Sequence, residues 1–126
     1  MSKDRIALGN KGEDLAADLL QAKGYKILYR NYRTKLGEID IVAQEKDIIC
    51  FVEVKTRSSD RFGYGSEAVL KTKQKQIGKA ALCFLKEKKL LEKKARFDVV
   101  ALDGASVEPR LNLIKDAFTL DERFSY

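Results

Sequence analysis

Two segments of the chain carry hydrophobic residues at helical spacing. Between residues 10 and 23, apolar side chains recur every three or four positions, which is the period of one face of an α-helix. Gly24 follows directly, where a glycine commonly ends a helix in a left-handed conformation. A second helical pattern covers residues 70–91, with Ile77, Ala81 and Phe84 on one face. The sequence therefore predicts two helices.

The remaining apolar segments are short and rich in β-branched or aromatic residues, and turn residues or polar loops separate them. The predicted strands are residues 25–33, 39–43, 48–55, 97–102 and 111–114. The resulting order, αβββαββ, predicts an α/β fold with one mixed central sheet flanked by helices. A length of 126 residues suits a single domain over residues 1–126, with residues from about 119 to 126 as a loosely held tail.

The second and third predicted strands form a hairpin with charged residues on one face. With a two-residue turn at residues 46–47, Asp40 lies opposite Glu53 and Glu38 lies opposite Lys55. A longer turn would shift this pairing by two residues and leave the two acids as diagonal neighbours. The other face is apolar and must be buried. It carries Ile39, Ile41, Ala43, Cys50, Val52 and Val54.

Asp40 and Glu53 are candidates for a metal site. Carboxylates that face each other with Cβ atoms about 4.5–5.5 Å apart repel and destabilise a sheet. A divalent cation would offset this repulsion, and Mg²⁺ and Mn²⁺ prefer carboxylate oxygens. Lys55 points to the same space and could stabilise negative charge on a phosphate. The alternative is a structural ion-pair network in which the lysine only neutralises the acids.

The distribution of charge indicates a polyanionic partner. The chain carries a net charge of +6, and residues 71–96 alone hold ten basic and two acidic residues. Such a concentration is typical of nucleic-acid binding, although a solubilising helix face is an open alternative. The chain contains no histidine. This excludes serine–histidine and cysteine–histidine catalysis and the usual zinc sites.

The first residues are charged, and no long apolar run follows them. We therefore expect neither a signal peptide nor a membrane span, and a cytoplasmic location without a membrane partner. Cys50 and Cys83 lie inside apolar runs. They are expected to be small buried hydrophobic residues in a reducing compartment.

Asp40 followed on the next strand by Glu53-Val54-Lys55 resembles the pattern of the PD-(D/E)xK nuclease superfamily, which has the restriction-endonuclease-like fold. Gly12-Glu13, residues 37–43 and residues 51–57 together resemble, more closely, the bacterial YraN family, which is similar to archaeal Holliday-junction resolvases. Ala117-Phe118 near the end also fits that family. The resemblance covers nearly the whole chain, with Ile39 standing where the superfamily name implies proline.

The resemblance implies a role for four residues. Asp40 and Glu53 would bind Mg²⁺ or Mn²⁺, Lys55 would be the catalytic lysine, and Glu13 would supply the extra acid of the resolvases at the metal and catalytic site. A helix cap is the alternative for Glu13, because Asn10 three residues earlier completes a capping-box pattern.

The expected function is that of a Mg²⁺-dependent endonuclease acting on DNA, with branched or junction DNA as one candidate substrate. The alternatives are a non-catalytic nucleic-acid-binding module that retains the nuclease fold, and an assembly protein whose charges only solubilise it. A homodimer is left open.

Several residues near the expected catalytic strand are candidates for nucleic-acid contacts. Those on the second helix are Lys71, Lys73, Lys75 and Lys79. Gln74 lies among them, where a solvated surface position is the favoured interpretation. The loop after the catalytic strand adds Arg57, Arg61 and Tyr64. Tyr64 could stack on a base, and an ordinary exposed loop is the alternative for this segment.

Overall fold

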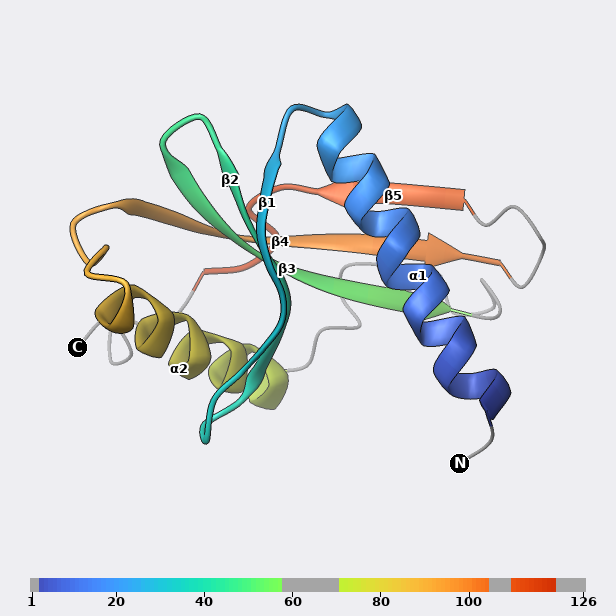
Figure 1. Cartoon of the computed structure of the whole chain (residues 1–126), viewed down its shortest axis with the longest axis horizontal. Coiled ribbons are helices and arrows are strands. Elements are labelled where there is room, and N and C mark those ends of the chain that lie inside the picture. Colours follow the sequence, from blue (N-terminus) through green and yellow to red (C-terminus); the bar gives the residue numbers. More distant parts are fainter. Residues whose placement is uncertain (1–2, 58–70, 105–109, 120–126) are drawn as a thin grey trace.

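The computed structural model describes residues 3–57, 71–104 and 110–119, with side chains described from residue 11 onward. Seven elements follow the predicted order (Figure 1). They are α1 (Lys3–Ala22), β1 (Lys26–Arg33), β2 (Glu38–Glu45), β3 (Ile48–Arg57), α2 (Lys71–Glu87), β4 (Lys94–Asp103) and β5 (Arg110–Ile114).

The strands form one five-stranded sheet in the order β1-β2-β3-β4-β5. β3 and β4 are parallel, and every other neighbouring pair is antiparallel. The parallel pair requires a crossover connection, and α2 lies within it. α1 and α2 each cover a separate hydrophobic core, one on each face of the sheet. This confirms the predicted α/β fold, in which helices flank one mixed sheet.

α1 ends as its sequence predicts. Gly24 adopts a φ of +96°, and its amide donates to the carbonyl of Gln21 at 3.1 Å. The Tyr25 amide donates to the Leu20 carbonyl at 2.9 Å. This pair of bonds is a Schellman motif, in which the residues at its two ends commonly pack together. Leu20 and Tyr25 are both buried in the core under α1. The helix begins at Lys3, seven residues before the predicted start.

α2 ends at Glu87, so the predicted extension to residue 91 is wrong. Lys89 adopts a φ of +59°, and the Leu90 amide donates to the Leu85 carbonyl at 2.7 Å. Leu85 and Leu90 then pack on the same core. The termination is again of the Schellman type, but a lysine takes the left-handed position. Residue type therefore gave no signal for it.

The β2–β3 hairpin has the predicted register. Glu45 pairs with Ile48, and the pairing continues to Ile41 opposite Val52. Ile41 and Val52 are buried under α1, as expected. Ile39 is the exception, because it is buried under α2. The alternation of faces therefore breaks at Asp40, and placing Ile39 on the same face as Ile41 was wrong.

The neighbouring strand explains this break. Arg30 pairs with Ile41 and Tyr32 pairs with Ile39, so that Asn31 lies opposite Asp40. Asn31 adopts a φ of +55° in the middle of β1, a left-handed conformation that interrupts the pleat. On either side of it, Tyr29 and Tyr32 both contact the Phe84 ring, although they are three residues apart. The irregularity turns Asp40 away from a regular strand position.

Candidate functional site

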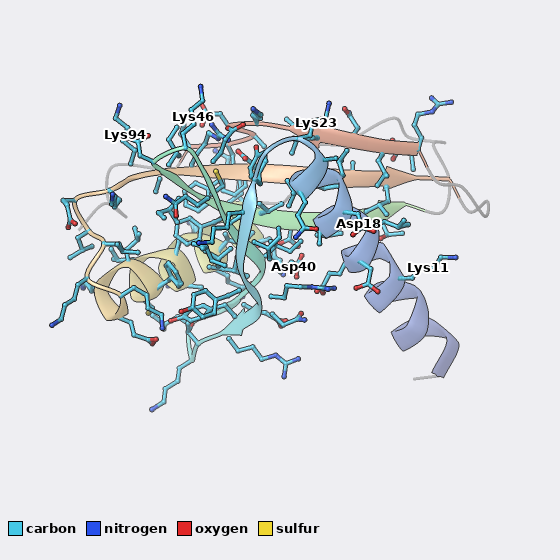
Figure 2. The ribbon with its side chains drawn as sticks, turned by 45° about the horizontal axis from the view of Figure 1, so that its top comes forward. Lys11, Asp18, Lys23, Asp40, Lys46 and Lys94 are labelled. Carbon is cyan, nitrogen blue, oxygen red and sulfur yellow. The ribbon has the colours of Figure 1, made fainter. Side chains whose placement is uncertain are left out.

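Asp40 lies where β2 and β3 separate. Its Oδ2 accepts a hydrogen bond of 2.8 Å from the Val54 amide, so that the carboxylate takes the place of a backbone carbonyl in the ladder. This bond fixes the orientation of the side chain without fully burying it. Figure 2 shows Asp40 beside α1. The carboxylate can therefore interact with groups from both faces of the sheet.

Glu53 is the buried partner of Asp40. Only 9% of Glu53 is exposed, and its carboxyl group interacts with that of Asp40. Burial and the neighbouring Asp40 charge raise the pKa of Glu53 to about 8. Burial also raises the pKa of Asp40, against the bond from Val54. Burial and mutual repulsion therefore favour one proton held in common by the pair near neutral pH.

Two lysines interact electrostatically with this pair. The Lys73 ammonium, from the first turn of α2, lies 3.9 Å from Glu53 Oε1. Lys73 and Lys55 both act to lower the pKa of Glu53, and Lys73 has the larger effect. The sequence pointed to Lys55 on the same strand. The proximity of Lys73 depends on how α2 packs and had no local signal.

Glu13 reaches the same site from α1. The helix begins at Lys3, which puts Asn10 inside it and excludes the predicted capping box. The structure instead places Glu13 near Asp40. Burial, and then the charge of Asp40, raise the pKa of Glu13. Gly12 permits this approach, because a Cβ at that position would lie 3.2 Å from Thr56 Oγ1 on β3.

Asn31 and Arg30 hold Glu13 in place. The Asn31 side-chain amide donates to Glu13 Oε1 at 3.1 Å, and Arg30 Nη2 lies 3.5 Å from the same oxygen. Arg30 also donates to Asp14 at 2.7 Å. No sequence pattern singled out Asn31. Asparagine is among the few non-glycine residues that tolerate a left-handed backbone, but this signal alone does not locate a site.

The two paired carboxylates suit a hard divalent cation. Within the described residues, no group of three or more aspartate, glutamate, cysteine or histidine side chains is close enough to hold a metal by itself. Mg²⁺ does not need such a cage, because it usually takes one or two carboxylates together with water and substrate phosphates. Asp40 and Glu53 meet that requirement, and Glu13 is near enough to Asp40 to interact with its charge.

The candidate nucleic-acid residues divide into three groups. Lys71, Lys75 and Lys79 are exposed on α2, and Gln74 is half-buried among them. Arg57 ends β3, and its side chain lies outside the described residues. Arg61 and Tyr64 also lie outside the described residues.

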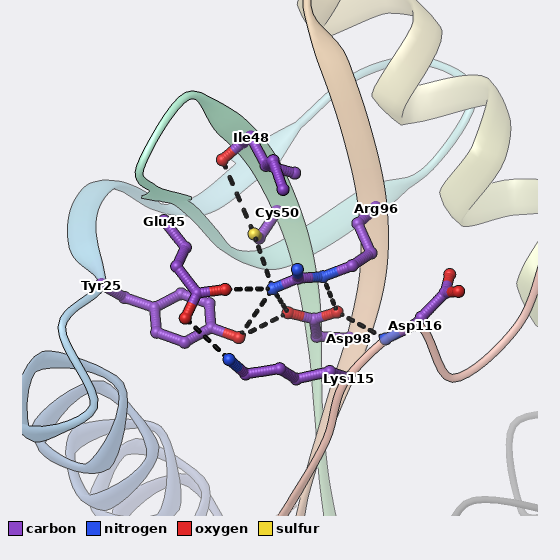
Figure 3. Close-up of polar contacts among 8 residues, drawn as sticks. All are labelled: Tyr25, Glu45, Ile48, Cys50, Arg96, Asp98, Lys115 and Asp116. Carbon is purple, nitrogen blue, oxygen red and sulfur yellow. Dashed lines mark hydrogen bonds and ion pairs between the residues drawn. The ribbon is translucent and has the colours of Figure 1, made fainter.

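A second polar cluster lies under the end of α1 (Figure 3). Asp98 is fully buried. It accepts bonds from Tyr25 Oη at 2.8 Å, Arg96 Nε at 2.9 Å and the Asp116 amide at 2.9 Å. Arg96 also bonds to Glu45 at 2.8 Å, and Glu45 accepts from Lys115 at 2.7 Å. Arg96, one of the ten basic residues in the segment 71–96, is therefore neutralised by acids inside the fold.

Comparison with known proteins identifies the family. The model of the uncharacterised protein family UPF0102 matches residues 12–102, a segment that contains Glu13, Asp40, Glu53 and Lys55. The chain belongs to this family. The match confirms the resemblance to the YraN family.

UPF0102 proteins of several bacteria match almost end to end. The protein of Caldicellulosiruptor saccharolyticus is 48% identical over 113 residues, covering 88% of this chain and 96% of its own. That of Syntrophus aciditrophicus is 49% identical and covers 91% of both chains. That of Geobacter metallireducens is 47% identical, covering 95% of this chain and 98% of its own. In the described part of this UPF0102 protein, neither helix has the length and apolar character needed to cross a membrane.

Proposed function

We propose that this UPF0102 protein binds DNA and cleaves it as a Mg²⁺-dependent phosphodiesterase. The observation that carries the proposal is the Asp40–Glu53 pair, in which two largely buried carboxyl groups interact beside Lys73. Holding two acids together in this way costs stability unless a proton or a cation neutralises them. Such an arrangement is common where pKa values are tuned for function.

The donor set determines which group would bind. Asp40 and Glu53 would provide two carboxylate oxygens to the metal. Glu13 would act on the metal through its interaction with Asp40 or through a bridging water molecule. Bound Mg²⁺ would supply Lewis-acid activation of a phosphodiester and lower the pKa of a water molecule. Glu53 would have to release its proton before it served as a ligand, so we expect metal affinity to rise with pH.

The two lysines would have different tasks. Lys55, on the same strand as Glu53, would donate to the attacking water or to a non-bridging phosphate oxygen as charge develops there. Lys73 lies against Glu53 through an ammonium that is still partly exposed, with 46% of its side chain accessible. Because its long stem can turn away once the acids bind a cation, Lys73 is suited to hold the phosphate of the substrate.

The surface of α2 would bind the DNA backbone. The first turn of α2 contains no acidic residue. Lys71, Lys75 and Lys79 are exposed along the solvent face of the helix, and Lys73 in the first turn contacts Glu53. Cations that neutralise phosphates release counterions, which makes binding tight at low salt and independent of sequence. The same surface would keep the scissile phosphate next to Asp40 and Glu53.

A non-catalytic nucleic-acid-binding module is the second candidate. One specific observation favours it. The described residues hold no complete cluster of three metal ligands, and the shared proton already neutralises the acid pair. On this reading the basic surface would remain in use, while Asp40 and Glu53 would form a protonated structural contact.

One experiment separates the two candidates. The purified protein is incubated with linear duplex, flap, four-way junction and single-stranded DNA and with RNA, in Mg²⁺, Mn²⁺ or EDTA, and its Mn²⁺ affinity is measured by calorimetry. We expect metal-dependent cleavage of a DNA substrate that Glu53→Gln abolishes, with the thermal melt of the variant still cooperative. Binding of DNA without Mn²⁺ affinity or cleavage would overturn catalysis in favour of the binding module. Failure to bind any nucleic acid would overturn both candidates.

A further inference from the structure

The turn between β1 and β2 is a rigid projection next to the site. We call residues Thr34–Gly37 the hairpin tip. The Thr34 hydroxyl oxygen accepts bonds from the Leu36 and Gly37 amides, both at 3.0 Å. The Thr34 amide also donates to the Gly37 carbonyl at 2.8 Å. Three short bonds inside four residues fix the conformation of the tip.

The hairpin tip is also fixed against α2. A Cβ at Gly37 would lie 2.7 Å from the backbone oxygen of Gln76 and 3.2 Å from its carbonyl carbon. The backbones of the tip and of the helix are therefore in direct contact, and only glycine permits this approach. In Figure 1 the tip projects beside the first half of α2. Any partner of the basic face of α2 would meet the tip as well.

The side chains of the hairpin tip are unusual for a surface turn. Leu36 is 51% exposed, the largest exposure of the large hydrophobic residues in the described part of the chain. Lys35 precedes it and is exposed. The Arg33 side chain at the end of β1 is 77% exposed, and its Nε lies 3.6 Å from Glu38 Oε1 in a surface ion pair that costs little to exchange for a phosphate. Lys75 and Lys79 lie on α2, on either side of Gln76 in sequence. The exposed leucine is thus next to an exposed lysine on the tip, and the tip contacts a helix that carries further exposed lysines.

This combination fits a nucleic acid better than a protein partner. Apolar side chains inserted between base steps unstack them and kink the duplex, and flanking cations bind the phosphates on either side. An apolar protein interface, in contrast, would have to desolvate Lys35 and the Arg33–Glu38 pair beside one leucine. The fixed conformation of the tip also suits a wedge, because little entropy is lost when it inserts.

The spacing along β2 relates the wedge to the acid pair. Leu36 precedes Asp40 by four residues, and an extended chain spans at most about 3.6 Å per residue. Leu36 and Asp40 are therefore separated by no more than about 14 Å of backbone. One DNA strand rises 3.4 Å per nucleotide, so this distance corresponds to about four nucleotides.

We propose that the hairpin tip is a wedge that inserts Leu36 at an unstacked position in DNA, with Arg33 and Lys35 on the adjacent phosphates. The preferred substrate is then a duplex with a branch, nick or mismatch, within about four nucleotides of the phosphate held at Asp40 and Glu53. This inference rests on the proposed DNA binding and names the substrate class of that site.

The test uses 2-aminopurine, a base whose fluorescence rises when it is unstacked. It is placed at successive positions from the branch point of a flap duplex, and binding is measured in EDTA. We expect a rise confined to one or two positions with the wild-type protein, and its loss with Leu36→Ala. Affinity for the flap should fall about tenfold in this variant, the size of one apolar contact with a base. Affinity for perfect duplex should change less than about twofold.

Leu91→Ala is the matched control. Leu91 is a second exposed leucine, 45% accessible, in the connection between α2 and β4. It should leave both the fluorescence and the affinity unchanged, and thermal melts should show that both variants are folded. DNA binding by the wild-type protein without local unstacking would overturn the wedge and leave the proposed function intact. A change of oligomeric state with Leu36→Ala would also overturn it, whereas absence of DNA binding would overturn the proposed function itself.

Discussion

Replacing Glu53 by glutamine should stabilise the metal-free protein at alkaline pH. The folded protein holds a proton on Glu53 up to about pH 8, whereas the unfolded chain releases it near the ordinary value of 4.5. Between these values the folded state binds more protons, so the free energy of unfolding falls as pH rises. Glutamine stays neutral and can still donate to Asp40, so the variant should lack this loss.

The structure sets the size of the effect. A pKa raised from 4.5 to about 8 corresponds to a loss of at most about 5 kcal/mol in the free energy of unfolding at alkaline pH. The pKa of about 8 already includes the attraction of Lys73 and Lys55 for the charged form of Glu53. Relaxation of the site and entry of water as the pair ionises reduce the loss further. We therefore expect a gain of about 2–3 kcal/mol for Glu53→Gln over wild type at pH 9, and almost none at pH 5.

The assay is urea unfolding in EDTA at pH values from 5 to 9, followed by circular dichroism. Glu45→Gln is the control, because Glu45 bonds to Lys115 and Arg96 and its pKa is lowered. Its stabilising contribution is present above 4.5 and is lost only as pH falls further, so this variant should be less stable than wild type by a constant amount over the same range. If the free energies of unfolding of Glu53→Gln and wild type run parallel from pH 5 to pH 9, the acid pair holds no shared proton and the pKa of Glu53 is not raised.

Three further predictions concern the site and the basic surface. Lys55→Ala should abolish cleavage and keep or tighten Mn²⁺ binding, because a nearby positive charge is lost. Calorimetry beside the nuclease assay tests this. Loss of metal affinity in the folded variant would contradict the role assigned to Lys55. Asn31→Gly keeps the left-handed backbone but removes the bond to Glu13. Calorimetry should therefore show weaker Mn²⁺ binding than in the control Lys46→Gly, whose residue is also left-handed. Equal affinities would show that only the backbone of Asn31 matters. Lys71→Glu with Lys75→Glu should weaken DNA binding strongly and flatten its salt dependence by about 0.9 per lost phosphate contact. Lys89→Glu with Lys93→Glu, beyond the end of α2, should do so weakly, and equal salt slopes for wild type and the first pair would contradict this placement of DNA.

The sequence was sufficient for the elements and for the acid pair, because both depend on local rules. Gly24 ends α1 where predicted, and the two-residue turn gives the β2–β3 register from Glu45 to Ile41. Asp40 and Glu53 lie 13 residues apart on adjacent strands of one hairpin, so turn length brings them close together, although the alternation of faces breaks at Asp40.

The same local rules failed at two non-glycine residues with a left-handed backbone conformation. Lys89 ends α2 in the left-handed region, which lysine does not signal. Asn31 interrupts β1 and moves Ile39 to the opposite core. Neither conformation is preferred by an isolated segment, and packing of leucines and tyrosines on the cores compensates for it.

Only the tertiary structure decided which groups surround the acid pair. Glu13 reaches Asp40 because α1 packs closely on β3 at Gly12. Lys73 reaches Glu53 because the crossover places the first turn of α2 beside β3. The hairpin tip meets the basic face of α2 through a contact between Gly37 and Gln76. The sequence by itself determined two adjacent strands and the closeness of their two carboxylates, since turn length sets the register of a hairpin. The third acid and the second lysine come from elements far apart in the chain, and their approach depends on how two hydrophobic cores pack.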